Sequence, residues 1–580
     1  MSLAAKFVPA WLRQYPREKL GADLAAGIIV TILVIPQSLA YALLAGLPPQ
    51  AGLYVSMFPV LAYAWLGSSM VQAVGPVAIT AIMTYTVLSP IAPPGSPEYI
   101  LLAACLSLIS GLLLLAFGVF RLGFLSQLLS RPVISGFISG SAVLIVLSQL
   151  KYLLGIHPDS GHVWTLLLSV VEQLPHSHGP TLIIGLSALA VLAFARNRLA
   201  GLLKGWGMAP GKAAFVARLV PLVVVLVGTL TVVGLDLDGP AGVQVVGPLV
   251  AGIPGFTFFT PSLASIKTLV VPTLLMTLIG MVQSISMAQA LAIKRRERVD
   301  ANAELVGLGA ANVVAAFYGG MPVGGGVSRS AINVAAGAET PLASIISALA
   351  MIALVAGAAA WFTRLPLAVL AASIMVAAVS MVDIKSLRQA WAYDRADAYA
   401  LLGTALGVVV LGLEAGIALG VGLSLATLVL RASTPHIAVI GRLPGSEHFR
   451  NVERHGVETI PGVLLLRIDE SLFFGNLEAV ESRLSQELAK APDTRDVVLI
   501  MSAVNRVDTT AMEVLTDLNR DLLARDIRLH LAEVKGPVQD RLSRSPLWSA
   551  LSGGVFLSVN GAFEALSTPP DTPDPTLSSP

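Results

Sequence analysis

Two stretches decide the fold: residues 72–88 read QAVGPVAITAIMTYTVL, and residues 320–337 read GMPVGGGVSRSAINVAAG. In each, a segment broken by glycine or proline leads into an apolar run shorter than the roughly 20 residues that span a bilayer. Interrupted hydrophobic segments at matching positions in two halves are typical of membrane transporters built from inverted repeats. We therefore expect a polytopic α-helical membrane protein in which these two short helices face each other near the middle of the bilayer.

The composition of the whole chain agrees with this interpretation. The 580 residues are 55% hydrophobic and 12% charged, with a mean hydropathy of +0.78, whereas a soluble protein carries roughly 25% charged residues. No charged residue occurs between Asp23 and Glu98. A single cysteine excludes an internal disulfide scaffold. The net charge of +2 is not the basic footprint of a nucleic-acid-binding protein.

Fourteen apolar runs are expected to form the membrane domain, and the two broken stretches lie seven runs apart. The runs cover residues 24–46, 52–66, 74–91, 100–119, 132–150, 180–195, 214–234, 268–293, 304–318, 327–337, 342–362, 365–381, 398–413 and 415–430. With the N-terminus inside, basic residues concentrate in the loops predicted to be cytoplasmic, most densely at residues 294–298. This bias predicts that both termini lie in the cytoplasm.

The chain is expected to divide into four parts. These are a cytoplasmic N-terminal segment (1–20), a transmembrane transport domain (21–431, with repeats at about 21–200 and 210–431), a soluble domain (435–567) and a tail (568–580). The prolines and small polar residues of the tail predict disorder. No cleavable signal peptide is expected, because the first apolar run is longer than an h-region and continues into further spans.

Arg329 lies just inside the second short helix and is the first candidate for a functional side chain. Arginine cannot lose its charge, and a charge inside a membrane is costly unless it faces a cavity or a partner. Acidic residues are scarce in the neighbouring runs. Because two half-helix N-termini also favour negative charge, the pattern predicts an anion site. The alternatives are a structural ion pair for Arg329 and close helix packing through the glycines.

Longer motifs resemble the sulfate permease (SulP) family of anion transporters. The resemblance is carried by IPQSLAYALLAGLPPQAGLYVSMFPVLAYAWLGSS (35–69), VGPVAITAIM (74–83), SISMAQALA (284–292) and the stretch at 302–345. The soluble region resembles the STAS domain that these transporters carry. The resemblance implies fourteen membrane segments as a 7+7 inverted repeat, a core domain that moves against a gate domain by alternating access, and a homodimer.

The resemblance also implies which residues bind the anion, since the family's site lies between the first, third, eighth and tenth segments. The matching positions are Gln37 and Tyr41 in PQSLAY, Val77 and Ala78 in GPVA, Gln283 before SISMA, and Val327, Ser328 and Arg329 in GVSR. Gln37 would donate an amide hydrogen bond, Tyr41 would line the pocket, and Arg329 would supply a positive field. A structural role is the alternative for each, such as packing for Tyr41.

Gln283 departs from the family pattern. Members that resemble proton- or sodium-coupled symporters carry an acidic residue here, and a neutral amide can neither take up a proton nor replace a carboxylate. The departure predicts that coupling through this residue is lost, which leaves exchange, facilitated flux or coupling through another group. We expect Gln283 to hydrogen-bond the anion or a pore water.

The region after the membrane domain has the pattern of a small α/β domain. Residues 463–468, 497–501 and 528–534 are strand-like, whereas apolar residues recur at helical spacing over 477–488 and 512–522. This alternation agrees with the STAS resemblance.

The family places a phosphorylatable or nucleotide-sensing hydroxyl before the central helix of this domain. The corresponding residues here are Thr509 and Thr510. Thr510 and Glu513 also form a T-x-x-E pattern, so a capping box is the alternative reason for these residues. A role of the domain in assembly, trafficking or binding of a regulatory protein is a further expectation.

These patterns favour a secondary transporter of inorganic or small organic anions in the cell membrane (inner or plasma membrane), with sulfate as the leading substrate. Two other functions stay open: a chloride, bicarbonate or dicarboxylate exchanger or uncoupled channel, and a membrane-anchored sensor based on the STAS domain. The sequence has no Walker loop, nucleophile–base pair or metal-ligand spacing, so we expect no enzyme, metal or cofactor. The expected partners are the anion, the bilayer, a second copy and a regulatory protein, but no nucleic acid.

Overall fold

The computed structural model describes residues 9–13, 15–127, 130–157, 163–239, 242–248, 252 and 254–567. The chain divides into two compact units, Met1–Ser424 and Leu425–Pro580. The tail expected at 568–580 lies outside the described residues.

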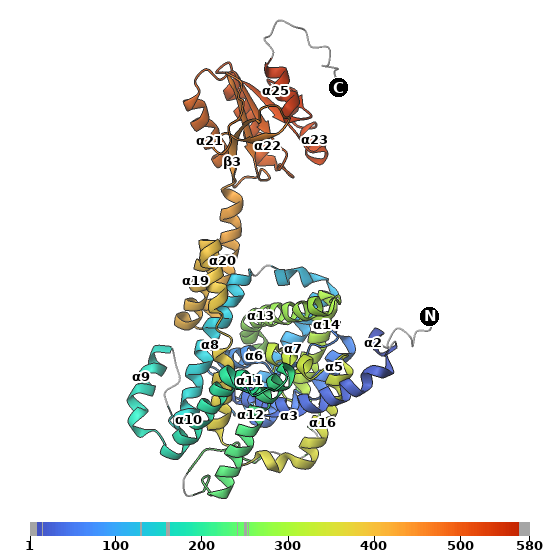
Figure 1. The fold of residues 1–580 in the computed structure, drawn as a ribbon, viewed down its shortest axis with the longest axis vertical. Coiled ribbons are helices and arrows are strands. Elements are labelled where there is room, and N and C mark those ends of the chain that lie inside the picture. The colour runs from blue at the N-terminus through green and yellow to red at the C-terminus, as the bar shows by residue number, and fades with distance from the viewer. Residues whose placement is uncertain are drawn as a thin grey trace. The chain divides into compact units, whose positions relative to one another are not determined.

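Within the described residues, each of the fourteen apolar runs coincides with a helix or with two consecutive helices (Figure 1). The first seven are α3 (Leu20–Leu44), α4 with α5 (Pro49–Tyr54, Phe58–Leu66), α6 (Ala78–Leu88), α7 (Pro97–Val119), α8 (Arg131–Leu154), α10 (Gly179–Phe194) and α12 (Pro210–Gly234). The second seven are α13 (Leu263–Arg295), α14 (Ala301–Tyr318), α15 (Val327–Ala335), α16 (Leu342–Ala358), α17 (Leu367–Val379), α19 (Arg395–Leu411) and α20 (Leu413–Ser433). Eight helices in the described part of the chain are long and apolar enough to cross a membrane. The expectation of a polytopic helical protein is confirmed.

Shorter helices precede or connect these segments. They are α2 (Ala10–Arg13), α9 (Val163–Gln173), α11 (Ala200–Gly205) and α18 (Ile384–Tyr393). The two halves repeat one order of elements: a long helix, a second helix, a two-residue strand that leads into a short helix, and then another long helix.

The two halves interlock through α7 and α14, which cross closely at glycines. A Cβ on Gly111 would lie 2.9 Å from the carbonyl oxygen of Gly309, and a Cβ on Gly309 would lie 2.7 Å from the amide nitrogen of Leu115. Small residues at such a crossing let the two backbones approach, which is how helices associate in the absence of water. Helix α3 packs against α16 in the same unit, whereas α8 packs along α17 and α19.

The second unit contains a six-stranded sheet with the order β4-β3-β5-β6-β7-β8. The strands are β3 (Ile437–Arg442), β4 (Phe449–Asn451), β5 (Val463–Ile468), β6 (Asp496–Ile500), β7 (Arg528–Ala532) and β8 (Val555–Phe556). Strands β5 to β8 are parallel, and β3 is antiparallel to both of its neighbours.

Helices cover both faces of this sheet (Figure 1). Apolar residues of α21 (Leu477–Lys490), α22 (Thr509–Leu523) and α23 (Gly536–Leu542) pack on one face, and those of α25 (Val559–Ser567) pack on the other. The short helix α24 (Pro546–Ala550) packs against α22. The predicted strands and helices are confirmed. Strand β6 starts and ends one residue earlier than the sequence pattern suggests, and β7 ends two residues earlier, at Ala532.

The alternative of a capping box at Thr510 is wrong. Helix α22 starts at Thr509, two residues earlier than a capping box at Thr510 requires, and its N-cap is Asp508, whose carboxylate accepts the N–H of Ala511 at 2.8 Å. Aspartate and threonine are both good N-caps, and here the aspartate comes first along the chain. Thr509 and Thr510 are both exposed in the first turn of the helix.

Candidate functional site

The two short helices start at a two-stranded antiparallel sheet. Strand β1 (Val74–Gly75) pairs with β2 (Gly324–Gly325), with Val74 opposite Gly325 and Gly75 opposite Gly324. Helix α6 begins shortly after β1, and α15 begins shortly after β2. The sheet therefore joins the starting points of two helices that come from different halves of the chain.

The N-caps of these helices lie against each other. Val77 is the N-cap of α6 and Gly326 is the N-cap of α15, and a Cβ on Gly326 would lie 2.9 Å from Cγ1 of Val77. Neither cap residue hydrogen-bonds its helix through a side chain. The first-turn N–H groups, including that of Ala78, are the positive ends of two helix dipoles, and such ends attract anions.

Arg329 adds a full positive charge at this crossing. Its Nη2 donates to the hydroxyls of Ser38 at 3.0 Å and Ser56 at 3.3 Å, and its Nη1 donates to the carbonyl oxygen of Val74 at 3.3 Å. The residue is only 4% exposed, and its Nε has no hydrogen-bond partner in the part of the chain that the structure describes. No carboxylate of the described residues forms an ion pair with it. The guanidinium is thus held in place by neutral groups and keeps its net charge.

A glycine in β1 makes room for this side chain. A Cβ on Gly75 would lie 2.0 Å from Nη1 and 2.5 Å from Cζ of Arg329. Gly75, which marks the helix break in the sequence, is therefore also the residue against which the guanidinium packs.

Gln37 and Tyr41 lie one turn apart on α3, on the same helix as Ser38. The amide of Gln37 donates to the hydroxyl of Tyr41 at 2.9 Å, and its Oε1 is buried without a hydrogen-bond partner among the described residues. Tyr41 is 6% exposed. Helix α3 thus brings Ser38 to the guanidinium of Arg329, and Gln37 and Tyr41 lie on the same stretch of that helix.

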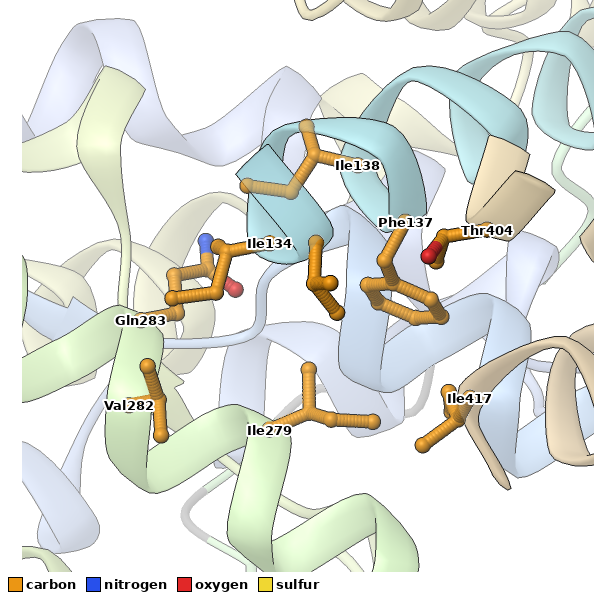
Figure 2. Close-up of a pocket in the computed structure, with 9 residues that line it drawn as sticks. Ile134, Phe137, Ile138, Ile279, Val282, Gln283, Thr404 and Ile417 are labelled. Carbon is orange, nitrogen blue, oxygen red and sulfur yellow. The ribbon is translucent and has the colours of Figure 1, made fainter. Parts of the chain in front are cut away.

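Two other predicted residues lie differently. Ser328 is exposed in the first turn of α15. Gln283 on α13 lines a cavity with Thr404 and seven apolar residues, namely Val133, Ile134, Phe137, Ile138, Ile279, Val282 and Ile417 (Figure 2). Arg329 is not among the residues that line this cavity. The side chain of Val327 lies outside the described part of the structure.

The residue after Gln283 faces a different neighbour. Successive residues of a helix are about 100° apart, so α13 presents Gln283 to α8, α19 and α20 and presents Ser284 to β2. The hydroxyl of Ser284 accepts the N–H of Gly325 at 2.9 Å. The side chain of Gln283 therefore points away from β2, the strand that leads into α15.

Sequence reasoning missed the hydroxyls that hold the guanidinium. Ser38 and Ser56 also hydrogen-bond each other at 2.9 Å, and Ser56 donates to the carbonyl oxygen of Gly52 at 2.8 Å. Their only sequence signal is a serine inside an apolar run, which is common in membrane helices and did not single them out.

Two family models match the chain. Residues 20–404 match the sulfate permease family, and residues 456–562 match the STAS domain. The chain belongs to the sulfate permease family. It is therefore a multi-pass helical membrane protein with a C-terminal STAS domain, as the motifs had indicated.

Several relatives of this family member are known by name. It is 34% identical over 548 residues to sulfate transporter 4.1, chloroplastic, of Arabidopsis thaliana. The aligned region covers 92% of this chain and 78% of that protein. It is 32% identical over 557 residues to a probable sulfate transporter of Mycobacterium tuberculosis. This aligned region covers 95% of the present chain and 96% of that protein.

Two solved structures share the fold. The murine Slc26a9 anion transporter in its inward-facing state has a TM-score of 0.86 at 22% identity and covers 97% of this chain and 95% of that one. The transmembrane domain of the cyanobacterial bicarbonate transporter BicA has a TM-score of 0.60 at 21% identity and covers 69% of this chain and 98% of that one. These likenesses confirm the predicted fold class.

Proposed function

We propose that this protein is a secondary anion transporter, with sulfate as its leading substrate, that binds the anion between the N-termini of α6 and α15. The observation that carries the proposal is Arg329, which is buried at this crossing with only neutral partners among the described residues. A buried cation without a counter-charge is costly, and a bound anion would relieve that cost. The names of the relatives, sulfate transporters, favour sulfate.

In this proposal the predicted residues other than Gln283 contact the anion in different ways. The N–H groups at the start of α6 (Val77, Ala78) and of α15 (Val327, Ser328) point toward negative charge without any capping side chain in the way. Arg329 contributes charge. The amide of Gln37 and the hydroxyls of Tyr41 and Ser328 complete the set of donors, whereas the amide of Gln283 lines the neighbouring cavity and would bind a pore water there.

Alternating access would come from two groups of helices moving against each other. Helices α3 to α7 pack with α13 to α16, whereas α8 packs with α17 and α19. The cavity next to Gln283 lies where α13 of the first group meets α8 and α19 of the second. A shift at this boundary would open the crossing to one side of the membrane or the other.

Gln283 favours a second mode of transport by the same site. Its side chain is neutral and faces an otherwise largely apolar cavity, so it offers no proton-binding group at the position where coupled members carry an acid. Exchange or uncoupled flux of chloride, bicarbonate or dicarboxylates is the transport mode that this residue supports.

The finer features of the assembly belong to the same proposal. The protein would lie in the cell membrane as a homodimer with both termini in the cytoplasm, a transport domain at 21–431 and a STAS domain at 435–567 that binds a regulatory partner. Thr509 and Thr510 are exposed and so accessible to a kinase. The relatives' names point to transport rather than to an enzyme.

Uptake of radiolabelled sulfate into liposomes that contain the purified protein tests the proposal. We expect uptake by the wild type, loss of uptake in Arg329→Ala, and unchanged uptake in Arg388→Ala, which removes an exposed arginine on α18. Adding an inward proton gradient or trapping anions inside the liposomes distinguishes symport from exchange. Full uptake by Arg329→Ala would refute the site, and retention of the biological role by a transport-dead Arg329→Ala would favour the sensor.

A further inference from the structure

Two carboxylates are fully buried in the membrane unit, Asp23 on α3 and Glu304 on α14, and both are 0% exposed. Neither forms an ion pair with a basic side chain in the part of the chain that the structure describes. Each instead accepts four hydrogen bonds of the same kinds: two from backbone N–H groups, one from a serine or threonine hydroxyl and one from a tyrosine hydroxyl. A carboxylate surrounded only by donors is satisfied in its ionised form.

Glu304 holds the segment that leads into β1. Its Oε1 accepts the N–H and the hydroxyl of Ser68 and the N–H of Ser69, all at 2.8 Å, and its Oε2 accepts the hydroxyl of Tyr63 at 2.6 Å. Glu304 belongs to the second half of the chain, and these partners belong to the first. The backbone that approaches α6 is therefore fixed by a charge in the other repeat.

Asp23 makes the reciprocal contact. Its Oδ1 accepts the N–H groups of Glu339 at 2.8 Å and Thr340 at 3.0 Å, and its Oδ2 accepts the hydroxyls of Thr340 at 2.6 Å and Tyr15 at 3.0 Å. Residues 339–340 follow α15 and belong to the second repeat. A carboxylate of each repeat thus anchors the segment adjoining the short helix of the other.

A buried chain of contacts links Glu304 to the crossing itself. The hydroxyl of Tyr63 lies 3.3 Å from Oε1 of Gln72, whose Nε2 donates to the carbonyl oxygen of Ser284 at 3.2 Å. The hydroxyl of Ser284 then accepts the N–H of Gly325 in β2 at 2.9 Å. Gln72 lies directly on that strand, because a Cβ on Gly325 would be 1.7 Å from its Nε2. Displacing the Tyr63 hydroxyl therefore affects the position of β2.

We infer that Asp23 and Glu304 are positioning residues for the anion site: their negative charges set the spacing of the two half-helix N-termini without touching the anion. This inference rests on the proposed function. An amide in place of either carboxylate would turn an NH2 group toward N–H and O–H donors, so the anchored segment would have to move. Because the N-caps Val77 and Gly326 lie against each other, a shift of the segment before α6 or of the segment after α15 changes the gap that the anion occupies.

Equilibrium binding of sulfate, chloride and bicarbonate to the full-length protein in detergent, measured by calorimetry beside the melting temperature, tests the inference. We expect Glu304→Gln and Asp23→Asn to raise the Kd of the bound anion at least tenfold. Tyr63→Phe removes one donor and leaves the other three of Glu304 in place, and we expect it to raise the Kd about threefold. The control Asp383→Asn alters a carboxylate that caps α18 and contacts Ser135 and Ser386 but neither short helix, and its Kd is expected to stay within twofold.

The outcomes separate the two proposals. If the wild type binds none of the three anions, the proposed anion site is refuted, and this inference is refuted with it. If the wild type binds an anion and the carboxylate variants bind it equally well, only the inference is overturned, however far their melting temperatures drop. Should Glu304→Gln and Asp23→Asn fail to fold, Tyr63→Phe decides: an unchanged Kd overturns the inference and a raised Kd supports it.

Discussion

The substitution Gly75→Ala tests whether the position of the Arg329 charge sets the affinity of the anion site. The φ angle of Gly75 lies outside the left-handed region, so the backbone accepts an alanine there. The new Cβ would lie 2.0 Å from Nη1 of Arg329, whereas ordinary contact begins at 3.4 Å. The guanidinium must therefore withdraw by about 1.4 Å.

The size of the effect follows from this displacement. An anion about 4 Å from the charge gains roughly 4 kcal/mol at an effective dielectric constant of about 20, and roughly 3 kcal/mol at about 5.4 Å. A loss of about 1 kcal/mol corresponds to about fivefold weaker binding. The contacts of Arg329 with Ser56 and Val74, which are already 3.3–3.4 Å long, would stretch beyond hydrogen-bond length. Because a hydrogen bond to a charged group is worth about 1.5–3 kcal/mol, the variant should also melt at a lower temperature.

The assay is the initial rate of sulfate uptake into liposomes as a function of sulfate concentration. We expect Gly75→Ala to raise KM about fivefold. Gly21→Ala is the matched control, because Gly21 lies in α3 and a Cβ there would meet no heavy atom within 4 Å. A KM for Gly75→Ala equal to that of the control would refute the reasoning that the guanidinium position governs affinity.

Other predictions concern coupling and the STAS domain. Gln283→Glu is expected to make uptake respond to an inward proton gradient, and an unchanged response would exclude coupling at this position. Asp508→Ala removes the N-cap of α22 and should lower the free energy of opening this helix by about 1 kcal/mol. Thr510→Ala should change the same free energy by less than about 0.5 kcal/mol. Hydrogen exchange of the α22 amides measures both effects. Burial alone would raise the pKa of the Asp496 carboxyl, but hydrogen bonds from a histidine and an arginine outweigh it and bring the pKa below its ordinary value. The ionised carboxylate stabilises the folded domain fully above the unfolded-state pKa of about 3.9, and this stabilisation is lost as the pH falls through the lower folded pKa. In the wild type, acid should therefore weaken the protection of β6 against hydrogen exchange. Asp496→Asn should remove this pH dependence.

The features that the sequence predicted are those with a local signal. Glycine and proline mark the breaks before α6 and α15 because they are the poorest helix formers, and the short apolar runs that follow are recognisable within a dozen residues. Arg329 stood out because an arginine inside an apolar run is rare for an energetic reason. In the STAS domain, the alternation of strand and helix patterns placed β5 at its observed limits.

The features that could not be predicted join residues far apart in the chain. Ser38 and Arg329 are separated by 291 positions, and Tyr63 and Glu304 by 241. A serine in an apolar run has the same local pattern whether it binds a guanidinium or its own helix backbone, as Thr31 does toward Gly27. The prediction of the α22 N-cap failed for a related reason. Asp508 and Thr510 both have side chains that can cap a helix, and only the backbone geometry selects one of them.

The choice of partners explains how the membrane unit keeps a positive site. Serine hydroxyls satisfy the N–H groups of Arg329 without cancelling its charge, whereas a carboxylate at residue 38 or 56 would form an ion pair and remove the field that attracts an anion. Asp23 and Glu304 likewise bind backbone N–H groups and hydroxyls instead of a basic side chain. Charges of both signs are therefore buried in one domain with neutral partners. The arginine charge remains available to an anion, while the two carboxylates hold the segments on which the crossing is built.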